Sequence, residues 1–224
     1  LEIEQGGRGM LLGGVPGTPA AKVTILGGGV VGANAARVAL GMEADVTIMD
    51  ISLPTLAQLD THFGGGLNTV FSTVDAVQQY VTEADLVIGA VLVPGGATPK
   101  LVSEDMVRDM KKSAVIVDVA VDQGGCVATS KPTTHSNPTY RVHDVVHYCV
   151  ANMPGAVART SAFALNNATL PFVLALANQG AHQALADNIH LRHGLNIHAG
   201  QVTYEPVATA TGEHYQPAER ALGL

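Results

Sequence analysis

The sequence predicts an α/β fold, namely a Rossmann-type, doubly wound parallel sheet with helices on both faces and a helical segment at the C-terminal end. Short β-rich runs alternate with helical patterns through the first two-thirds of the chain, which is the signature of successive βαβ units. The runs TILG, LVIGAV and AVIVDVAV are apolar almost throughout, as in strands that are buried on both faces. A glycine-rich turn follows the first of these runs.

The individual elements follow from the same alternation. The predicted strands are residues 21–26, 45–49, 67–71, 86–90 and 114–119, and the predicted helices are residues 30–42 and 53–63. Residues 124–138 are rich in Gly, Thr, Ser, Pro and His and are expected to form a long ordered loop. A strand pair is expected at 141–150, followed by a helical stretch at 158–178 that is interrupted near Pro171. Residues 181–224 are only weakly periodic.

The composition limits the classes of function. Hydrophobic residues make up 47% of the chain and charged residues 14%, which excludes intrinsic disorder and leaves apolar surface for a partner. The net charge is −7 and no basic stripe is present, so neither a nucleic acid nor an anionic membrane is an expected partner. The longest apolar run, residues 168–177, is about half the length of a bilayer span, and no transmembrane helix is expected.

The start of the chain and its two cysteines bear on where the protein works. No basic segment followed by an apolar one opens the sequence, so secretion is not expected. Cys126 and Cys149 could form one bridge, but two thiols in an acidic α/β chain favour a reduced, cytoplasmic protein. The opening residues 1–17, LEIEQGGRGMLLGGVPG, begin with Leu1 and are typical of a connecting segment. We therefore expect a piece of a longer protein.

The glycine-rich turn fits the fingerprint of a dinucleotide site. Gly27, Gly29 and Gly32 form G-x-G-x-x-G directly after a predicted strand and at the start of a predicted helix. The first glycine permits a tight turn, the second lets the backbone approach a pyrophosphate, and the third lets helix and strand pack closely. The helix N-terminus offers free N–H groups to the phosphates. A tight turn without a dinucleotide is the alternative interpretation.

Asp50 strengthens the dinucleotide interpretation and favours NAD over NADP. It closes the second predicted strand, DVTIMD, where an acidic side chain can accept hydrogen bonds from ribose hydroxyls. A 2′-phosphate would be repelled by this carboxylate, and the following residues ISLPTLAQ contain no Arg or Lys to receive it. NAD is therefore the expected cofactor.

Four further segments resemble the alanine dehydrogenase family, and the resemblance extends to about Asn178. They are RGMLLGGVPG at 8–17, ADLVIGAVLVPG at 84–95, VDVAVDQGGC at 117–126 and YCVANMPGAV at 148–157. The related NAD-binding subunit of proton-translocating transhydrogenase shares the glycine turn, but the DQGG and CVANMP blocks favour the dehydrogenase. The resemblance implies a connecting segment at 1–20 that follows an N-terminal domain, an NAD-binding domain at 21–157, and C-terminal helices and tail at 158–224.

The resemblance also implies a set of cofactor-binding residues. Val30 and Val31 would line the pyrophosphate, Asp50 would bind the adenosine ribose, and Ser72 would lie near the adenine. The residues beside the nicotinamide half would be Val91, Leu92, Val119, Ala120, Val121, Asp122, Val150, Ala151, Asn152 and Met153. Lys131 stands where an Arg is common in the family, and Thr55 stands where a basic residue often contacts the adenosine half.

The resemblance to the alanine dehydrogenase family implies that Asp122 is the catalytic residue. Oxidative deamination needs a base for the amine and the attacking water, and Asp122 follows a central strand at the sheet edge where ligands gather. From the residues alone, an ordinary loop acid before Gly124 and Gly125 is the favoured interpretation. Asp118 is interpreted as structural, and it would share a face with Asp122 if the strand continued.

The nine histidines do not predict a metal site. His143, Asp144 and His147 are close in sequence, but His143 and His147 would share one face of a strand rather than enclose a metal, and no set of ligands completes a tetrahedron. By resemblance, the catalytic histidine and the cations that hold the substrate carboxylate belong to the N-terminal domain. The expected metal content is none.

The expected function is thus the NAD-dependent, reversible conversion of L-alanine to pyruvate and ammonia, with this chain supplying the cofactor part. The family forms hexamers, so a homo-oligomer is expected. One alternative is a transhydrogenase-type NAD-binding subunit, which would need a membrane partner. Another is a truncated NAD-binding module that has no catalysis of its own and acts at a partner interface.

Overall fold

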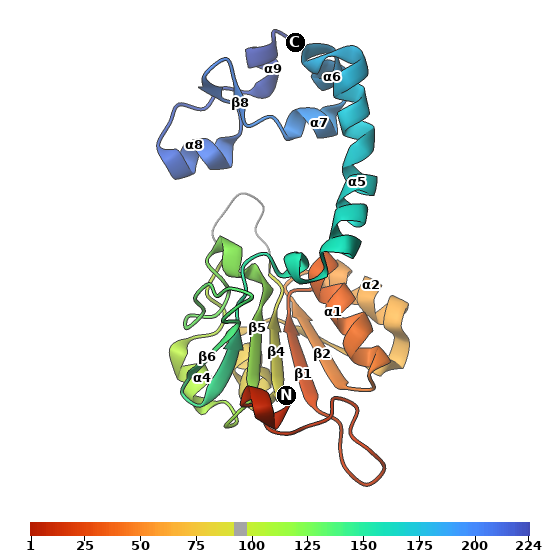
Figure 1. Ribbon diagram of the computed structural model, residues 1–224, viewed down its shortest axis with the longest axis vertical. Coiled ribbons are helices and arrows are strands. Elements are labelled where there is room, and N and C mark those ends of the chain that lie inside the picture. The colour runs from red at the N-terminus through yellow and green to blue at the C-terminus, as the bar shows by residue number, and fades with distance from the viewer. Residues whose placement is uncertain (92–97) are drawn as a thin grey trace. The chain divides into compact units, whose positions relative to one another are not determined.

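The computed structural model describes residues 1–91 and 98–224, which form two compact units, Leu1–Met153 and Pro154–Leu224 (Figure 1). The predicted division at residues 20 and 157 stays a prediction.

A seven-stranded sheet forms the centre of the first unit, in the order β3-β2-β1-β4-β5-β7-β6. Its strands are β1 (Lys22–Leu26), β2 (Asp45–Asp50), β3 (Leu67–Phe71), β4 (Leu86–Gly89), β5 (Val115–Asp118), β6 (Thr139–Val142) and β7 (Val145–Tyr148). All neighbouring pairs are parallel except β6 and β7. The predicted doubly wound α/β fold is confirmed, and the carboxyl ends of six strands meet at one edge.

Helices cover both faces of this sheet and bury two separate apolar clusters. They are α1 (Val30–Gly41), α2 (Leu53–Phe63), α3 (Val74–Glu83) and α4 (Glu104–Asp109), with short 3₁₀ turns η1 (Ile3–Gln5), η2 (Gly64–Gly66) and η3 (Val119–Gln123). Successive strand residues point to opposite faces. Ile25 accordingly packs in the cluster that contains α1 and α2 residues, and Leu26 packs in the cluster that contains α3 and α4 residues.

Side-chain caps explain where three of these helices begin. Ser52, Thr73 and Ser103 each accept a hydrogen bond from the backbone amide three residues later, at the starts of α2, α3 and α4. Such caps satisfy an N–H group that has no partner within the helix and stabilise it by about 1 kcal/mol. The loop 124–138 contains no helix or strand, as expected.

The strand pair near residue 145 differs from its prediction in one respect. Strands β6 and β7 form a hairpin whose two turn residues, His143 and Asp144, have φ angles of 49° and 63°. A two-residue hairpin of this hand needs positive φ at both central positions. The expectation that His143 and His147 share a strand face is therefore wrong, because His143 lies in the turn and only His147 lies in β7.

The second unit consists mainly of helices. After the 3₁₀ turn η4 (Met153–Val157), it contains α5 (Ala158–Gln179), α6 (Ala181–Asp187), α7 (Ile189–His193), α8 (Glu205–Thr211) and α9 (Ala218–Leu222), with a ribbon of β8 (Ile197–His198) and β9 (Gln201–Val202). The weakly periodic tail thus forms regular elements. Its core is small and includes Ala184, Leu185, Ala208 and Leu222.

Helix α5 corrects two expectations. It runs through Pro171 without interruption, because proline removes a single i→i−4 hydrogen bond while the surrounding Ala and Leu residues have high helix propensity. Residues Met153–Gln179 are also long and apolar enough, by length and composition, to cross a membrane, and none of that window is buried. The expectation of no transmembrane helix rested on the short apolar run at 168–177. The helix is longer than that run, so its length does not exclude a membrane span.

Candidate functional site

The glycine turn adopts the geometry that its three glycine positions require. Gly27 has a φ of 101°, and a Cβ there would come within 3.0 Å of the Ala90 backbone. A Cβ at Gly29 would meet nothing within 4 Å, so this glycine faces open space. A Cβ at Gly32 would clash with the Gly27 carbonyl oxygen. The turn is therefore tight, open at Gly29 and closely packed at Gly32, as a pyrophosphate site needs.

The N-terminus of α1 is free to receive an anion. Its N-cap residue is Gly29, which has no side chain to accept from the first amides of the helix. Val30 is 82% exposed and Val31 is 41% exposed, so the first turn is open to solvent. Unpaired N–H groups together with the helix dipole favour a phosphate at this position.

Asp50 connects this turn to the end of β2. One of its carboxylate oxygens accepts a hydrogen bond from the Gly28 amide at 2.7 Å, and the other accepts from the Ser52 amide at 2.8 Å. Each oxygen keeps a further lone pair that can accept from a ribose hydroxyl. Asp50 thus fixes the glycine turn and presents an acceptor beside it.

A cavity of about 530 Å³ lies at this edge of the sheet, and its lining brings together most of the predicted adenosine-side residues. The predicted residues in the lining are Gly27, Gly29, Val30, Val31, Asp50, Ser72 and Val91. Sequence reasoning missed Met49, Ile51, Ala90, Pro99 and Leu101, although Met49 and Ile51 flank Asp50 and could have been inferred from that position. Leu92 lies outside the described residues.

Asp118 is the hub of a second cluster, at the carboxyl end of β5. Its side chain is fully buried and accepts hydrogen bonds from the amides of Ala120 and Val127, both at 3.2 Å, and from the Ser130 hydroxyl at 2.7 Å. The Cys126 thiol lies 3.7 Å from the same carboxylate. Burial and this negative neighbour raise the pKa of Cys126, which therefore stays a thiol.

The turn η3 separates Asp118 from Asp122. Strand β5 ends at Asp118, whose side chain caps the turn. The strand does not continue to Asp122, so the condition for a shared strand face is not met. Within the turn, Ala120 and Val121 are buried, whereas Val119 is half-buried and Asp122 is exposed. An Asp122 carboxylate oxygen lies 3.5 Å from the Asn152 amide.

The loop after β7 therefore lies beside Asp122. It comprises Val150, Ala151, Asn152 and Met153, and Asn152 has a φ of 55°, a conformation that Asn tolerates better than most residues. The two segments predicted to frame the nicotinamide are thus adjacent, at the same sheet edge as the glycine turn.

A polar network joins strands β6 and β7 to the loop 124–138, which follows the η3 turn. The fully buried His147 ring bonds to the Thr129 hydroxyl at 2.8 Å and stacks on Tyr140 with 5.0 Å between ring centroids. The Tyr140 hydroxyl donates to the Thr129 carbonyl and accepts from the Lys131 amide. Burial lowers the pKa of His147 and raises that of Tyr140, so both are neutral at pH 7.

Lys131 is not part of the cavity lining. Its ammonium group lies over the Tyr140 ring, 4.6 Å from the centroid. This cation–π contact holds the side chain on the β6 side of the network. Its predicted role in cofactor binding stays a prediction.

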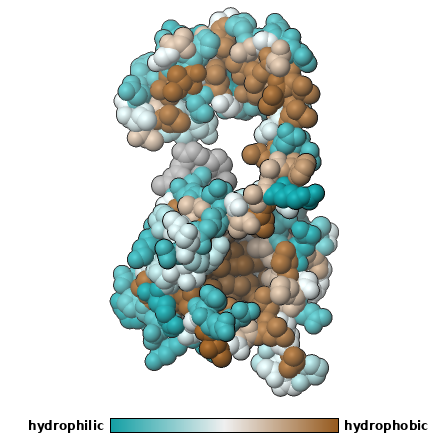
Figure 2. All heavy atoms as spheres, viewed as in Figure 1, coloured by the Kyte–Doolittle hydropathy of each residue, from teal (hydrophilic) through white to brown (hydrophobic). Residues whose placement is uncertain are grey.

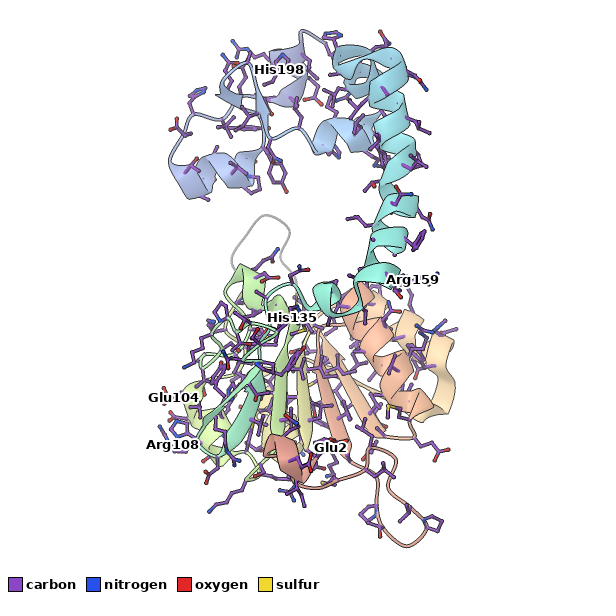
Figure 3. The ribbon with its side chains drawn as sticks, viewed as in Figure 1. Glu2, Glu104, Arg108, His135, Arg159 and His198 are labelled. Atoms are coloured by element: carbon purple, nitrogen blue, oxygen red, sulfur yellow. The ribbon has the colours of Figure 1, made fainter. Side chains whose placement is uncertain are left out.

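The histidines and acids form no metal cluster within residues 1–91 and 98–224. His143 pairs instead with Glu104 at 2.8 Å, and Glu104 also lies 3.9 Å from Arg108. Figure 3 shows Glu104 and Arg108 on the outside of the first unit, whereas His135 lies near the carboxyl ends of the strands and His198 lies in the second unit.

Comparison with known proteins places this site in a family. Residues 1–205 match the family model "Alanine dehydrogenase/PNT, C-terminal domain". An alanine dehydrogenase of Halomonas elongata is 61% identical over 223 residues, which are 100% of this chain and 60% of that protein. An alanine dehydrogenase of Bacillus subtilis is 57% identical over 99% of this chain and 59% of its own length. The chain thus spans about three-fifths of the length of these relatives.

Among solved structures, an alanine dehydrogenase is more similar to the chain than a transhydrogenase is. An L-alanine dehydrogenase structure superposes with a TM-score of 0.88 at 52% identity, covering 95% of this chain and 58% of that one. A transhydrogenase from Sinorhizobium meliloti superposes with a TM-score of 0.61 at 26% identity, covering 69% of this chain and 45% of that one.

Proposed function

Because the chain belongs to the alanine dehydrogenase/PNT family, whose C-terminal domain it matches, we propose that it is the cofactor half of an NAD-dependent alanine dehydrogenase. The reaction is the reversible oxidative deamination of L-alanine to pyruvate and ammonia. The observation that carries the proposal is the cavity formed by the glycine turn and Asp50, in a chain 61% identical to an alanine dehydrogenase.

The adenosine half of NAD is bound by the residues around the glycine turn. The free amides at the start of α1 receive the pyrophosphate, and Gly29 allows its close approach. Asp50 accepts from the adenosine ribose, and Ser72 lies beside the adenine. The apolar walls supplied by Met49, Pro99 and Leu101 exclude water from the rings.

The η3 turn and the loop after β7 would hold the nicotinamide half. When bound there, NAD would supply the acceptor for the hydride that leaves the substrate Cα. The exposed Asp122 carboxylate accepts the proton released from the substrate nitrogen or the attacking water and returns it in the reverse reaction. The backbone amide of Asn152 faces the Asp122 carboxylate. This contact holds the η3 turn and the loop after β7 at the spacing that the nicotinamide ring requires.

The remaining groups are assigned to the part of the protein outside this chain. No histidine of the described residues has Asp122 as a hydrogen-bond or ion-pair partner. The catalytic histidine and the cations for the substrate carboxylate therefore come from the other two-fifths of the length seen in the relatives. The same proposal includes a cytoplasmic homo-oligomer, in which the free Cys126 and Cys149 stay reduced.

The proposal is favoured over a transhydrogenase subunit by the comparisons. The dehydrogenase structure shares twice the sequence identity, 52% against 26%, and superposes over more of the chain.

The proposal is tested with the protein that carries this chain together with the rest of its length. We expect L-alanine to support NAD reduction at alkaline pH. Asp122→Asn should lower kcat at least about 100-fold, since general acid–base groups contribute about 10²–10⁴-fold. Its NADH affinity should stay within about twofold of the parent's.

The matched control is Asp75→Asn, an exposed acid on α3, which should leave both quantities unchanged. Absence of alanine-dependent reduction in the parent protein, with NADH binding intact, would refute the substrate assignment. A fully active Asp122→Asn variant would refute the catalytic one.

A further inference from the structure

Residues 98–102 run alongside the segment that follows Asp122. The Thr98 amide donates to the Gln123 carbonyl at 3.0 Å, the Leu101 amide donates to the Cys126 carbonyl at 2.8 Å, and the Ala128 amide donates back to the Val102 carbonyl at 2.8 Å. Pro99 and Leu101 line the cofactor cavity. One wall of the cavity is therefore hydrogen-bonded to the segment that contains the Asp122 turn.

Lys100 lies between these two cavity residues and adds a charged contact. Its ammonium group donates to the Gly124 carbonyl and, at 3.2 Å, to the Val127 carbonyl. Charge-assisted hydrogen bonds of this kind are roughly twice as strong as neutral ones. Neither carbonyl belongs to a helix or strand, so Lys100 supplies order that regular secondary structure does not.

A charged side chain contacts each end of the η3 turn, and the two side chains have opposite charges. At its N-terminal end, the buried Asp118 carboxylate accepts from the Ala120 amide. At its C-terminal end, Gly124 adopts a left-handed φ of 89° and its carbonyl receives the Lys100 ammonium. A negative group at the start and a positive group at the end both complement the dipole of the turn. Asp122 lies between them, two residues before Gly124.

We propose that Lys100 is a positioning residue for the reaction: together with Asp118 it clamps the η3 turn and thereby fixes the Asp122 carboxylate toward Asn152 and the nicotinamide. Lys100 is not among the described residues that line the cofactor cavity. It couples the cavity wall at Pro99 and Leu101 to the proton-transferring group. This inference rests on the proposed role of Asp122.

The test replaces Lys100 in the full-length protein. Lys100→Met keeps the length of the side chain and removes its charge and its hydrogen bonds, whereas Lys100→Arg can still donate to both carbonyls. We expect Lys100→Met to lower kcat by about 10- to 100-fold, because a displacement of about 1 Å costs on that order. The KM for L-alanine and the affinity for NADH should change by less than about threefold, and Lys100→Arg should recover most of kcat.

Two further measurements separate positioning from loss of structure. Lys112→Met, an exposed lysine on the same unit, is the control and should leave kcat unchanged. Hydrogen exchange of the Val119–Gly125 amides should accelerate in Lys100→Met, while the amides of β1 and β2 keep their protection. A kcat within twofold of the parent's in Lys100→Met, or a Lys100→Arg variant as impaired as Lys100→Met, would overturn the inference.

Failure of the proposed function gives a different pattern. In that case the Asp122→Asn variant keeps its activity, or the parent protein does not turn over alanine at all. Amide hydrogen exchange alone then tests whether Lys100 anchors the η3 turn. Faster exchange confined to the turn supports Lys100 as its anchor, and unchanged exchange overturns that role.

Discussion

At the scale of single residues, most of the site is determined by short-range rules. The spacing of Gly27, Gly29 and Gly32 is enough to predict the turn. A Cβ would conflict with backbone atoms at Gly27 and Gly32, whereas at Gly29 it would extend into the open space where a pyrophosphate is expected. Asp50 is equally predictable from its place at the end of a strand. The hydrogen bond that Asp50 accepts from the Gly28 amide was not, because it depends on how two segments that are distant in sequence meet.

Gly32 and Gly41 form a matched pair for testing the steric argument. Both lie in α1, but a Cβ at Gly32 would clash with the Gly27 carbonyl, whereas a Cβ at Gly41 would meet nothing within 4 Å. We expect Gly32→Ala to lower the free energy of unfolding by about 1–3 kcal/mol, as overpacking does. Gly41→Ala should be neutral or stabilising by up to about 1 kcal/mol, because alanine favours the helix.

Thermal and denaturant unfolding of the two variants, followed by circular dichroism, measures this difference. NADH binding should weaken in Gly32→Ala only. Equal stability of the two variants would show that the backbone of the turn adjusts freely and that close packing at Gly32 is not what the third glycine provides.

At the scale of elements, the pattern of apolar runs predicted the strands, the strand pair at 141–150 and the helical stretch at 158–178. It predicted neither the position of the β6–β7 turn nor the continuation of α5 through Pro171. The hairpin turn falls on His143 and Asp144, two residues that tolerate positive φ better than most but do not announce it as Asn-Gly would. Helix α5 continues through Pro171 because helix propensity around the proline outweighs one missing hydrogen bond. Both results depend on competition between neighbouring preferences, which single-residue rules do not resolve.

The β6–β7 hairpin predicts a pH dependence of stability. Burial lowers the pKa of His147 below its ordinary value of 6.5, so the unfolded chain binds this proton more readily than the folded chain. The free energy of unfolding should therefore be constant with respect to this group above pH 6.5. It should fall as the pH decreases from 6.5 toward the lowered pKa, by up to about 1.4 kcal/mol per pH unit.

Denaturant unfolding at pH 7.5, 6.5 and 5.5 checks this prediction, with His147→Gln and the exposed His62→Gln compared at each pH. The decrease in the free energy of unfolding between pH 6.5 and 5.5 should be smaller in His147→Gln than in the parent and unchanged in His62→Gln. A parental slope that persists in His147→Gln would assign the acid sensitivity to other groups.

At the scale of the whole molecule, the composition already indicated surface for a partner. Phe163, Leu165 and Val173 on α5 are 61%, 66% and 54% exposed. Figure 2 shows apolar side chains at the surface of the second unit and in a hollow of the first. Exposed apolar surface of this extent marks a site of contact with a protein or a membrane. Sequence alone indicated its presence through the 47% hydrophobic content but not its location.

We predict that this surface takes part in self-association. Light scattering at micromolar concentration should give a mass above the 23.0 kDa of one chain. Replacing Leu165 and Val173 together by serine should shift the mass toward the monomer, while the far-UV spectrum stays the same because both side chains are exposed. A monomer at all concentrations, or an assembly unaffected by the double variant, would contradict a role for α5.

The most direct test of the central claim is a fluorescence titration of this chain with NADH, with NADPH and with the Asp50→Asn variant alongside. We expect one saturable NADH site per chain and much weaker binding of NADPH, whose 2′-phosphate would meet the Asp50 carboxylate. In Asp50→Asn the NADH dissociation constant should rise at least about tenfold, since bonds to a charged acceptor contribute about 1.5–3 kcal/mol. Absence of NADH binding to the folded chain, or equal binding by parent and variant, would contradict the assignment of this site.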